Sequence, residues 1–526
     1  SVCDDQIIIS STVRRTGNYN PSLWGFDYLQ SLTGEYQEEK YLIRASELVE
    51  QVKILLLMEE QILELPIPNL ELIDNLHRLG ISQHGFRVSQ DVFDCFKNET
   101  GDYFEESLGD NNTKGLLQLY EASFLMTRGE NTLELAREFA TNLLRKKLDR
   151  INGDDDVLLL TAVRHALELP IHWRVQRPNA RWFIEEAYAK SRDMNPIVLE
   201  LAKLDFNIVQ AKHQQELKHV SSWWEKTSIA KVLPFARDRV VENYLWTTGI
   251  FDPQYGYSRI MATKVNALVT VIDDVFDVYG TLEELQIFNH VIQRWDIEAM
   301  DKLPHYMQIC FLALNNFVDE LAYDVLKQQG ILIIPHLRKS WGDLCKAYMQ
   351  EAEWYYAKHT PTKEEYIENA WISISAPAIV SQAYFLVTNP IDKEAVRSLY
   401  QYHNIVRCSS MVLRLANDLG TSSDEMSRGD VPKLIQCYMR ETSANIEEAR
   451  EYVMSIMRET WKKTNEELLR VDINADSQLL PQNVIKIAAD LGRMAQYMYQ
   501  HGDGHGIQNL EMKDRISSLL FDPFPI

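Results

Sequence analysis

The sequence has few cysteines and no pattern that gives them a structural use. Six cysteines are scattered over 526 residues, and no two of them form a CxxC pair. This spacing argues against a disulfide framework and against a zinc site. We therefore expect buried free thiols, in a reducing or stromal compartment, at Cys3, Cys95, Cys310, Cys345, Cys408 and Cys437.

An excess of positive charge is also missing. The chain holds 54 basic residues against 76 acidic ones, and its formal net charge is −22. A surface of this sign repels phosphate backbones, so we expect no nucleic-acid partner. An anionic small-molecule substrate would need local cations to bring it to the protein.

Long apolar runs and alternating strands are absent as well. We find no apolar run of membrane-spanning length and no signal-peptide pattern at the N-terminus. Because no segment alternates steadily between apolar and polar residues, few strands are expected. There is no short internal repeat, which argues against a solenoid. A convincing Ser-His-Asp or Cys-His signature is missing too, so no protein nucleophile is expected.

Helical periodicity is what the sequence does contain. Apolar residues recur at helical spacing, for example over 133–150 and 446–470. Capping boxes are predicted at Thr362–Glu365 and Asn445–Glu448. The segment 221–239 interrupts the pattern, and the chain is too long for one ordinary core. The sequence therefore predicts an all-α protein of two helical domains, with bounds 1–225 and 226–526.

The apolar stretch KVNALVTVIDDVFDVYG, residues 264–280, carries three acids near its end. The sequence GTLEE at 280–284 predicts that this helix ends and that another begins. Asp273 and Asp277 share one face, whereas Asp274 is turned aside as a partner behind them. Two stacked carboxylates at the negative end of a helix dipole repel each other, and a divalent cation reverses both penalties. The apolar approach favours such a metal site over a solvated acidic helix end.

A second polar stripe lies in VLRLANDLGTSSDE, residues 412–425. Arg414, Asn417, Thr421 and Glu425 recur at helical spacing and share one face. Arg414 is suited to a phosphate, and the other three offer oxygen ligands to one further ion. The alternative is an ordinary polar helix face.

Further cations precede and follow these stripes. Lys433 comes after Pro432 at a predicted helix start, where a cation costs about 0.3–1 kcal/mol unless an anion binds there. Arg237 and Arg239 flank Asp238 upstream of the acidic helix. Their use depends on whether they reach the same cavity.

Four motifs occur in a fixed order: Arg-Arg-x8-Trp at 14–24, RDR at 237–239, DDxxD at 273–277 and NDxxTxxxE at 417–425. Together, and with a similarity that runs nearly end to end, they resemble the plant class I terpene synthases of the monoterpene branch. The match is closest to sage-type enzymes that form 1,8-cineole. DDxxD alone is also found in prenyl-chain elongases, so the set of four carries the resemblance. The class II motif DxDD is absent, and the acids at 154–156 are predicted to lie in a loop.

The resemblance implies both an architecture and a metal site. The C-terminal domain would be a class I helical bundle, and the N-terminal domain an α-barrel of the class II type with a capping N-terminal strand segment. Three Mg²⁺ ions are implied, with Mn²⁺ as an alternative. Two of them would be ligated by Asp273 and Asp277, and the third by Asn417, Thr421 and Glu425.

The resemblance also implies roles in substrate binding. Diphosphate would be held by Arg237, Arg414 and Lys433, and through the ions by Asp273, Asp277 and Asn417. Arg14 and Arg15 would cap the closed site and act in the isomerisation step. Between LHRLGIS (76–82) and QHGFRVSQ (83–90) the family has a longer, helix-bearing stretch, which puts the continuity of the N-terminal domain in doubt.

Asn266 is polar within an apolar run. It lies seven residues before Asp273, with Thr270 between them on the same face. At 1.5 Å per residue this places it roughly 10 Å below the metal ligands, about the depth that a ten-carbon chain occupies. A buried asparagine satisfied by backbone groups is the commoner outcome. We hypothesise instead that Asn266 orients a water that captures the α-terpinyl cation, with Trp246 as an aromatic wall and HGDGHG (501–506) as a lid.

The expected reaction is therefore conversion of geranyl diphosphate to 1,8-cineole and diphosphate. The alternatives are a synthase of sabinene, α-terpineol or bornyl diphosphate, a sesquiterpene synthase, and an inactive helical scaffold whose ligand stripes should have eroded. We expect a plastid enzyme whose transit peptide is absent from this chain. It would be a monomer or homodimer that does not span a membrane.

Overall fold

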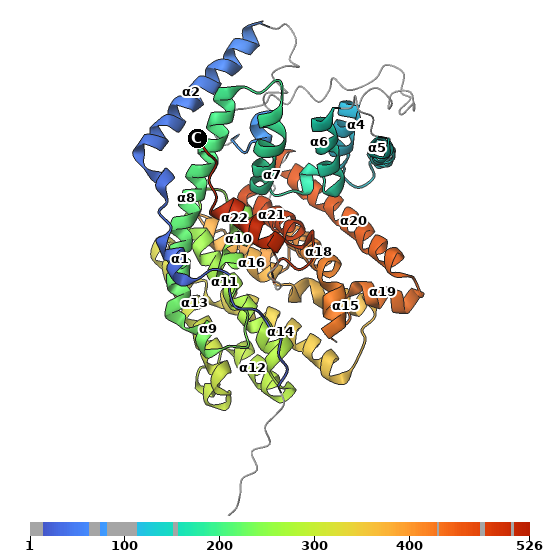
Figure 1. The fold of residues 1–526 in the computed structure, drawn as a ribbon. Helices are drawn as coiled ribbons and strands as arrows, with labels where there is room; N and C mark the ends of the chain where they lie inside the picture. The colour runs from blue at the N-terminus through green and yellow to red at the C-terminus, as the bar shows by residue number, and fades with distance from the viewer. Residues whose placement is uncertain are drawn as a thin grey trace, which may run out of the picture.

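The structure, a computed structural model, describes residues 14–62, 74–81, 113–150, 156–428, 431–473, 479–505 and 510–526, with the backbone alone at 57–62, 422–428 and 470–473. Helices dominate these ranges, and no strand occurs within them (Figure 1). The all-α prediction is confirmed. The N-terminal segment expected as a capping strand, residues 14–25, forms neither a helix nor a strand.

The N-terminal half places short helices around one long one. Helix α8 runs over 32 residues with α2 packed along it, and α4, α5 and α6 pack on one another (Figure 1). Among the described residues of this half, η1 (Glu35–Gln37), η5 (Ile171–Trp173) and η7 (Tyr188–Lys190) are 3-10 helices, and η6 (Phe183–Ala187) is a π-helix. The main helices are α1 (Phe26–Ser31), α2 (Glu39–Ile62), α4 (Thr113–Ser123), α5 (Asn131–Asp149), α6 (Val157–Glu168), α7 (Gln176–Trp182) and α8 (Pro196–Thr227).

The C-terminal half is a larger bundle that begins with α9 (Ile229–Val232) and α10 (Val240–Ile250). Its other helices are α11 (Gly256–Asp274), α12 (Leu282–Arg294), α13 (His305–Gln329), α14 (Ile334–Ala357), α15 (Lys363–Ser373), α16 (Ala376–Val387), α17 (Lys393–Tyr400), α18 (Asn404–Arg428), α19 (Leu434–Thr442), α20 (Ile446–Ile473), α21 (Gln482–Tyr499) and α22 (Leu510–Leu520).

Five of these helices close a ring that carries the predicted site. Helix α11 packs on α10, α10 on α21, α21 on α18, α18 on α16, and α16 again on α11. The helix of the aspartate motif and the helix of the second stripe therefore belong to one closed packing unit. Residues 273 and 417, far apart in the sequence, lie on two members of the same ring.

The two halves share one hydrophobic core. Helix α8 continues to Thr227 and packs on α10 and α11, so the predicted boundary at 225 falls inside a helix. The interruption expected from residue 221 begins at Ser228, whose φ of 55° lies in the left-handed region. Buried residues from Trp24 to Phe524 form one continuous cluster. A division into domains 1–225 and 226–526 stays a prediction.

Local signals in the sequence are matched by the structure. Thr362 and Glu365 form a reciprocal capping box at the start of α15. Asn445 and Glu448 exchange the same pair of hydrogen bonds at 2.9 and 3.0 Å. Both capping boxes are confirmed.

The expectation that no apolar run reaches membrane-spanning length was wrong for one segment. Residues Lys363–Val387 are long and apolar enough to cross a membrane by length and composition, but 78% of the most apolar window is buried inside the protein. The segment also comprises two helices, α15 and α16, separated at Ser375 with a φ of 69°. Core packing accounts for its apolar character.

The thiol prediction holds wherever it can be compared. Four cysteines, Cys310, Cys345, Cys408 and Cys437, are free and buried. The predicted loop at 154–156 is described only at Asp156, which caps α6 by accepting hydrogen bonds from the backbone of Leu158 and Leu159. Outside the described residues lie Cys3, Cys95, Asp154, Asp155 and residues 82–90.

Candidate functional site

The aspartate motif spans the end of α11. The α-helix stops at Asp274, a π-helical turn η8 (Val275–Tyr279) follows, and Gly280 is extended before the capping box that starts α12. The predicted helix end is confirmed. Asp273 and Asp277, however, are separated by a π turn and not by the α-helical turn we expected. Turns of this kind occur frequently at functional sites.

Arg237 holds the buried side of the motif. Its backbone N–H and its Nε donate to Asp274 Oδ2 at 2.7 and 3.1 Å, and its Nη2 donates to Asp273 Oδ2 at 2.5 Å. The Asp274 side chain is fully buried, whereas the Asp273 side chain keeps 28% of its surface exposed. Asp274 therefore lies behind Asp273 as a structural partner, and Asp273 presents the accessible carboxylate.

The second stripe is buried and cross-linked. Arg414 donates through Nε to Asp418 Oδ1 at 2.8 Å and through Nη2 to Asn417 Oδ1. Tyr366 Oη donates to both oxygens of Asp418 at 2.9 Å. Thr421 is buried, and its hydroxyl donates to the Asn417 carbonyl at 2.9 Å. Arg414 and Asn417 thus lie together on α18, as their spacing predicts.

Two predicted residues remain less defined. Lys433 is the N-cap of α19 and not its first helical residue, and its backbone N–H donates to Gln436 Oε1 at 3.0 Å. The lysine is therefore one position further from the helix than we expected. The side chain of Glu425 lies outside the described residues, although its backbone belongs to α18.

Tyr499 ends α21 and lies near the second stripe. Burial raises the pKa of its hydroxyl, and a hydrogen bond with Asn417 and the charges of Arg414 and Arg237 oppose that rise. The backbone after Tyr499 lies tightly on α18, because a Cβ added at Gly420 would meet the Tyr499 and Gly502 carbonyl oxygens at 2.8 and 3.2 Å. The segment that follows α21 therefore closes against the second stripe.

The N-terminal arginines dock at the end of the aspartate motif. Arg14 makes a bidentate ion pair with Glu284, both bonds at 2.7 Å, and donates to the Tyr279 carbonyl at 3.1 Å. Arg15 Nη1 donates to the Asp277 carbonyl at 2.6 Å, and its guanidinium lies 3.9 Å from the Tyr355 ring centroid. The predicted capping pair thus lies beside the motif.

Asn266 keeps one amide atom without a partner. Its Nδ2 donates to the Asn243 carbonyl at 3.2 Å, whereas its Oδ1 is buried without a hydrogen bond. Thr270 continues the stripe and donates to the Asn266 carbonyl at 2.8 Å. Leaving a buried acceptor without a hydrogen bond costs about 1–3 kcal/mol of stability. The Asn266 oxygen is therefore a position where a bound molecule with a hydrogen-bond donor fits.

His505 joins this group from the glycine-rich loop. Trp246 Nε1, which can only donate, bonds His505 Nδ1 at 3.3 Å, and His505 Nε2 lies 3.3 Å from Thr270 Oγ1. Nδ1 is therefore the acceptor, and Nε2 carries the proton toward Thr270. Mainly through burial, the pKa of His505 is lowered to about 3, so the ring is neutral at physiological pH.

The expected loop and wall are thus brought together with Asn266. His501 to His505 are described and Gly506 is not, so the predicted lid is seen in part. Trp246 is buried and its ring centroid lies 6.1 Å from that of Tyr499. Both predicted elements border the Asn266 group.

Several residues of this site went unnoticed in the sequence. Glu284, Asp418, Tyr366 and Tyr499 contact predicted residues but were given no role in the site, although Asp418 belongs to the NDxxTxxxE motif and Glu284 to the predicted helix start. Asp418 follows Asn417 directly and was readable as a partner of Arg414 at i,i+4. The other three come from separate helices, and no spacing connects them to the stripes.

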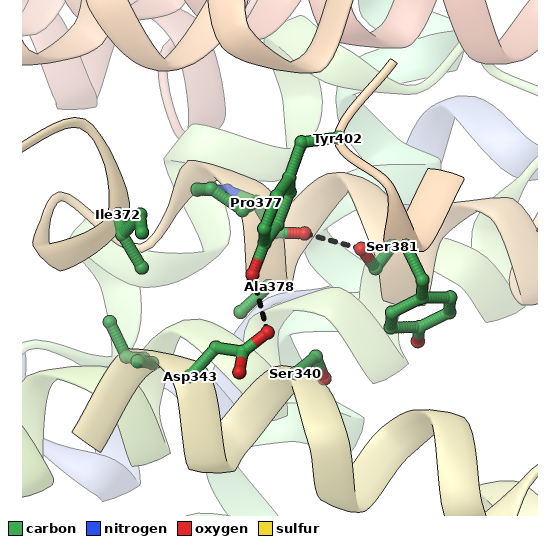
Figure 2. Close-up of a pocket in the computed structure, with 9 residues that line it drawn as sticks. Ser340, Asp343, Ile372, Pro377, Ala378, Ser381 and Tyr402 are labelled. Atoms are coloured by element: carbon green, nitrogen blue, oxygen red, sulfur yellow. Dashed lines mark hydrogen bonds between the residues drawn. The ribbon is translucent and has the colours of Figure 1, made fainter. Parts of the chain in front are cut away.

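A separate cavity between α14 and α16 is unrelated to these residues. It has room for about one water molecule and is lined by Ser340, Asp343, Ser381 and Tyr402, among others (Figure 2). Tyr402 Oη donates to Asp343, and Ser381 Oγ donates to the Pro377 carbonyl at 2.6 Å. None of the predicted site residues lines it, and it is too small for a ten-carbon substrate.

Comparison with known proteins identifies the family. Residues 225–463 match the description "Terpene synthase family, metal binding domain", and residues 82–167 match "Terpene synthase, N-terminal domain". The chain is 52% identical to a (−)-alpha-terpineol synthase of Vitis vinifera, over 98% of this chain and 91% of that protein. The chain belongs to the terpene synthase family. This terpene synthase is also 51% identical to the chloroplastic cineole synthase 1 of Salvia fruticosa, over 97% and 90% of the two chains.

Solved structures of the family have the same fold. A limonene synthase bound to 2-fluorolinalyl diphosphate superposes with a TM-score of 0.90 at 50% identity, covering 98% of this chain and all of that one. An isoprene synthase from grey poplar leaves, solved with three Mg²⁺ ions and dimethylallyl-S-thiolodiphosphate, gives a TM-score of 0.82 at 38% identity, over 96% and 99% of the chains. The predicted helical architecture is confirmed.

The donor set in this terpene synthase fits a hard divalent cation. Oxygen donors, the ligand type that magnesium prefers, come from Asp273 on α11, Asp277 on the η8 turn that follows it, and Asn417 and Thr421 on α18. Within the ranges that the structure covers, no three His, Cys, Asp or Glu side chains converge on one point. Two of these four donors are neutral, and Glu425, the remaining acid of the stripe, is not described there.

Proposed function

We propose that this terpene synthase is a magnesium-dependent monoterpene synthase that converts geranyl diphosphate to 1,8-cineole and diphosphate by water capture of the terpinyl cation. The observation that carries the proposal is the buried, unpartnered Oδ1 of Asn266. The amide Nδ2 gives one of its two N–H groups to the Asn243 carbonyl, and the unpartnered oxygen binds a water by accepting a hydrogen bond from it. The lone pairs of that water are then free to attack a cation.

The charged residues act on the leaving group. Arg237, Arg414 and Lys433 would bind diphosphate, and Asp273, Asp277, Asn417, Thr421 and Glu425 would hold three Mg²⁺ ions, with Mn²⁺ as an alternative. Bound metal would neutralise the charge that develops on the departing diphosphate. Arg237 and Arg414 now pair with Asp273 and Asn417, so substrate would exchange these partners.

Neutral residues would govern the hydrocarbon. Trp246 presents a ring whose face tolerates positive charge. His505 stays neutral and donates to Thr270, so this group adds no second cation beside the carbocation. The proposed sequence is ionisation, ring closure and attack of the Asn266-bound water, which loses one proton to give the alcohol. In ether closure the ring double bond takes up a proton, the hydroxyl oxygen bonds to the resulting cation, and the hydroxyl proton leaves. Arg14 and Arg15 would cap the site during isomerisation.

A second product, α-terpineol, fits the same observation. Both products require capture of the cation by water, and they differ only in whether the new hydroxyl closes onto the ring. The relatives at 52% and 51% identity are named for terpineol and cineole, one for each outcome. Sabinene or bornyl diphosphate formation and a sesquiterpene substrate would leave the Asn266 oxygen without a role. An inactive scaffold is disfavoured because the ligand stripes are intact.

The cellular setting follows from the same relatives. The Salvia relative is named as chloroplastic, which supports a plastid location. We also propose a catalytic domain over 226–526 behind an N-terminal helical domain over 1–225, in a monomer or homodimer.

The test is product analysis with labelled water. The protein would be incubated with Mg²⁺ and either geranyl or farnesyl diphosphate in H₂¹⁸O, with products separated by gas chromatography and mass spectrometry. We expect ¹⁸O-labelled 1,8-cineole from geranyl diphosphate as the main product. Asn266→Ile should lower the oxygenated share by about 5- to 150-fold, because a lost water site of this kind is worth about 1–3 kcal/mol.

A matched variant controls for the loss of any buried asparagine. Asn315, on α13, is also buried, but its Oδ1 accepts a 2.8 Å bond from Trp295. Asn315→Leu should therefore leave the product ratio unchanged. An oxygenated share that survives in Asn266→Ile would refute the role of Asn266, and hydrocarbon products alone from the unchanged protein would refute the cineole assignment.

A further inference from the structure

The segment that precedes α1, residues 14–25, is held by its side chains. We call it the strap. Tyr19 lies over the guanidinium of Arg237, 5.2 Å from its ring centroid, and the Asn20 carbonyl accepts a 3.0 Å bond from buried Arg239. These contacts lie between the arginine pair at one end of the strap and Trp24 at the other. A segment without regular structure depends on such anchors, because ordering each residue costs about 1–2 kcal/mol of entropy.

Trp24 forms the anchor at the α1 end. Its side chain is buried, and its ring centroid lies 4.8 Å from that of Phe521 and 6.2 Å from that of Tyr28. Tyr28 and Phe521 meet edge to face at 5.4 Å, so three rings close one cluster. Phe521 follows α22 and comes from the opposite end of the sequence.

The segment 521–524, which we call the tail, is fixed in place before it meets Trp24. Asn207 on α8 makes a reciprocal pair with Phe524, donating to its carbonyl at 2.9 Å and accepting from its N–H at 2.8 Å. Gln214 donates to the Leu520 carbonyl at 2.9 Å, and Arg181 donates to the Asp522 carbonyl at 2.6 Å. Side chains of α7 and α8 thus satisfy the backbone at the end of α22, and Figure 1 shows the chain end beside α8.

We propose that the tail is a clasp for the strap: Phe521, held on α8, positions Trp24 and through it the segment that carries Arg14 and Arg15. Phe521 is a positioning residue, since it contacts the strap and none of the metal or diphosphate candidates. Without the Phe521 ring, the whole strap up to α1 is free to move. The next fixed point is Gln30 of α1, which donates to the Lys218 carbonyl and to Ser221 of α8 at 3.0 and 2.9 Å. The longer free segment then spends less time with its arginines docked.

The part of this inference that concerns catalysis rests on the proposed capping role of Arg14 and Arg15. The part that concerns structure does not, because release of the strap can be measured without substrate. Arg14 and Arg15 are themselves trypsin sites that docking protects. The two readouts therefore separate failure of the clasp from failure of the proposed function.

The experiment compares Phe521→Ala with Phe183→Ala in the full chain. Phe183 is also half-buried, and it packs on Tyr188 and Arg78, away from the strap. Limited trypsin digestion followed by intact mass would measure cleavage after Arg14 and Arg15. We expect cleavage about 5- to 10-fold faster in Phe521→Ala alone, the change that loss of one aromatic contact of about 1 kcal/mol produces.

Kinetics supply the second readout. Phe521→Ala should raise KM for geranyl diphosphate about fivefold with a smaller change in kcat, and Trp24→Ala should do the same. The double variant should match either single one, because both remove the same anchor. Phe521→Leu, which keeps the apolar volume, should restore most of the protection. Trp24→Ala, which removes the other ring of the same anchor, covers the case in which Phe521→Ala fails to fold.

Two results would overturn the clasp. One is that Phe521→Ala, or Trp24→Ala if the former does not fold, is cleaved no faster than Phe183→Ala and the unchanged protein. The other is strictly additive effects of the Trp24 and Phe521 substitutions. Faster cleavage with unchanged kinetics would retain the clasp and refute the capping role of the arginines.

Discussion

Asn266 differs from most buried asparagines because its neighbours leave one of its atoms without a bond. The Asn243 carbonyl accepts one amide N–H, and Thr270 donates to the Asn266 backbone carbonyl, whereas the side-chain oxygen is buried without a hydrogen bond. Trp246 and His505 fix the direction of donation on the other side of Thr270. Orientation of this amide therefore comes from residues on three separate segments.

His505 leads to a prediction about pH. Its pKa is lowered to about 3 by burial, with Arg237 and Arg239 adding to the effect, whereas an unfolded histidine titrates near 6.5. Between about pH 6.5 and 3 the histidine is therefore protonated in the unfolded chain and neutral in the folded one. The free energy of unfolding decreases as pH falls below about 6.5. Between pH 7 and 5 this group alone should remove about 2 kcal/mol from the free energy of unfolding.

His505→Gln tests that contribution, because glutamine retains a donor toward Thr270 and does not titrate. Urea unfolding at pH 7 and 5 should show a loss of stability about 2 kcal/mol smaller in the variant than in the unchanged protein. His219→Gln, at an exposed histidine, is the control and should behave as the unchanged protein. Equal pH dependence in all three proteins would contradict a neutral buried His505.

Single residues were predictable from the sequence where they broke a pattern. Asn266 stands out because an amide interrupts an apolar run, and Arg414 and Asn417 stand out by helical spacing. His505 did not stand out, because a glycine-rich loop has no regular spacing from which the orientation of a histidine side chain could be predicted. Glu284 was visible only as a helix cap, because its second partner, Arg14, lies 270 positions away.

At the scale of elements, the strap meets α12 through one residue that serves two purposes. Glu284 completes the capping box with Thr281 and also binds both Nη atoms of Arg14 at 2.7 Å and Tyr306 Oη at 2.8 Å. Partial burial alone would raise the pKa of Glu284, but hydrogen bonds from Arg14, Thr281 and Tyr306 outweigh it and lower the pKa to about 2. A helix start and the strap therefore share one carboxylate.

Glu284→Gln separates these two purposes. Glutamine can still accept the backbone N–H of the capping box, so α12 should remain intact. Loss of the charge should weaken docking of Arg14 by about 1 kcal/mol and raise KM for geranyl diphosphate roughly fivefold. Steady-state kinetics would measure this, with Glu283→Gln, exposed in the same helical turn, as the control.

The same ion pair also has a defined pH range. Because the folded pKa of Glu284 lies below its unfolded value near 4.5, the stabilisation is complete above about pH 4.5 and is lost as pH falls toward 2. The protection of the strap against cleavage after Arg14 and Arg15 should therefore be constant from pH 8 to 5. A release of the strap near pH 6 in the unchanged protein would contradict the assignment.

Elements were predictable from the sequence in their type and less so in their detail. The capping boxes and the end of the aspartate helix came from local side-chain chemistry, which acts within one turn. The π turn at 275–279 did not, because its residues are as apolar and periodic as those of an α-helix. The uninterrupted run of α8 to Thr227 was missed because the polar and aromatic residues from 221 on obscured its period.

For the whole molecule, the junction of the two halves is built around a buried charge. Arg259 on α11 is fully buried, and its Nε and Nη2 donate to Glu216 of α8 at 2.8 Å each. Tyr244 on α10 donates to the same carboxylate at 2.7 Å. Sequence patterns within either half contain no trace of this contact, because its three residues belong to no common spacing.

Removal of one partner should therefore destabilise both halves together. Glu216→Gln leaves the Arg259 charge buried without a counter-ion, which costs about 3–5 kcal/mol. Chemical denaturation should show a single transition shifted to lower denaturant, because α8 belongs to the continuous core. The exposed pair of Arg44 and Glu200, also joined at 2.7 Å, is the control, and Glu200→Gln should cost less than about 1 kcal/mol. A Glu216→Gln protein in which one half unfolds well before the other would show that the halves are independent domains after all.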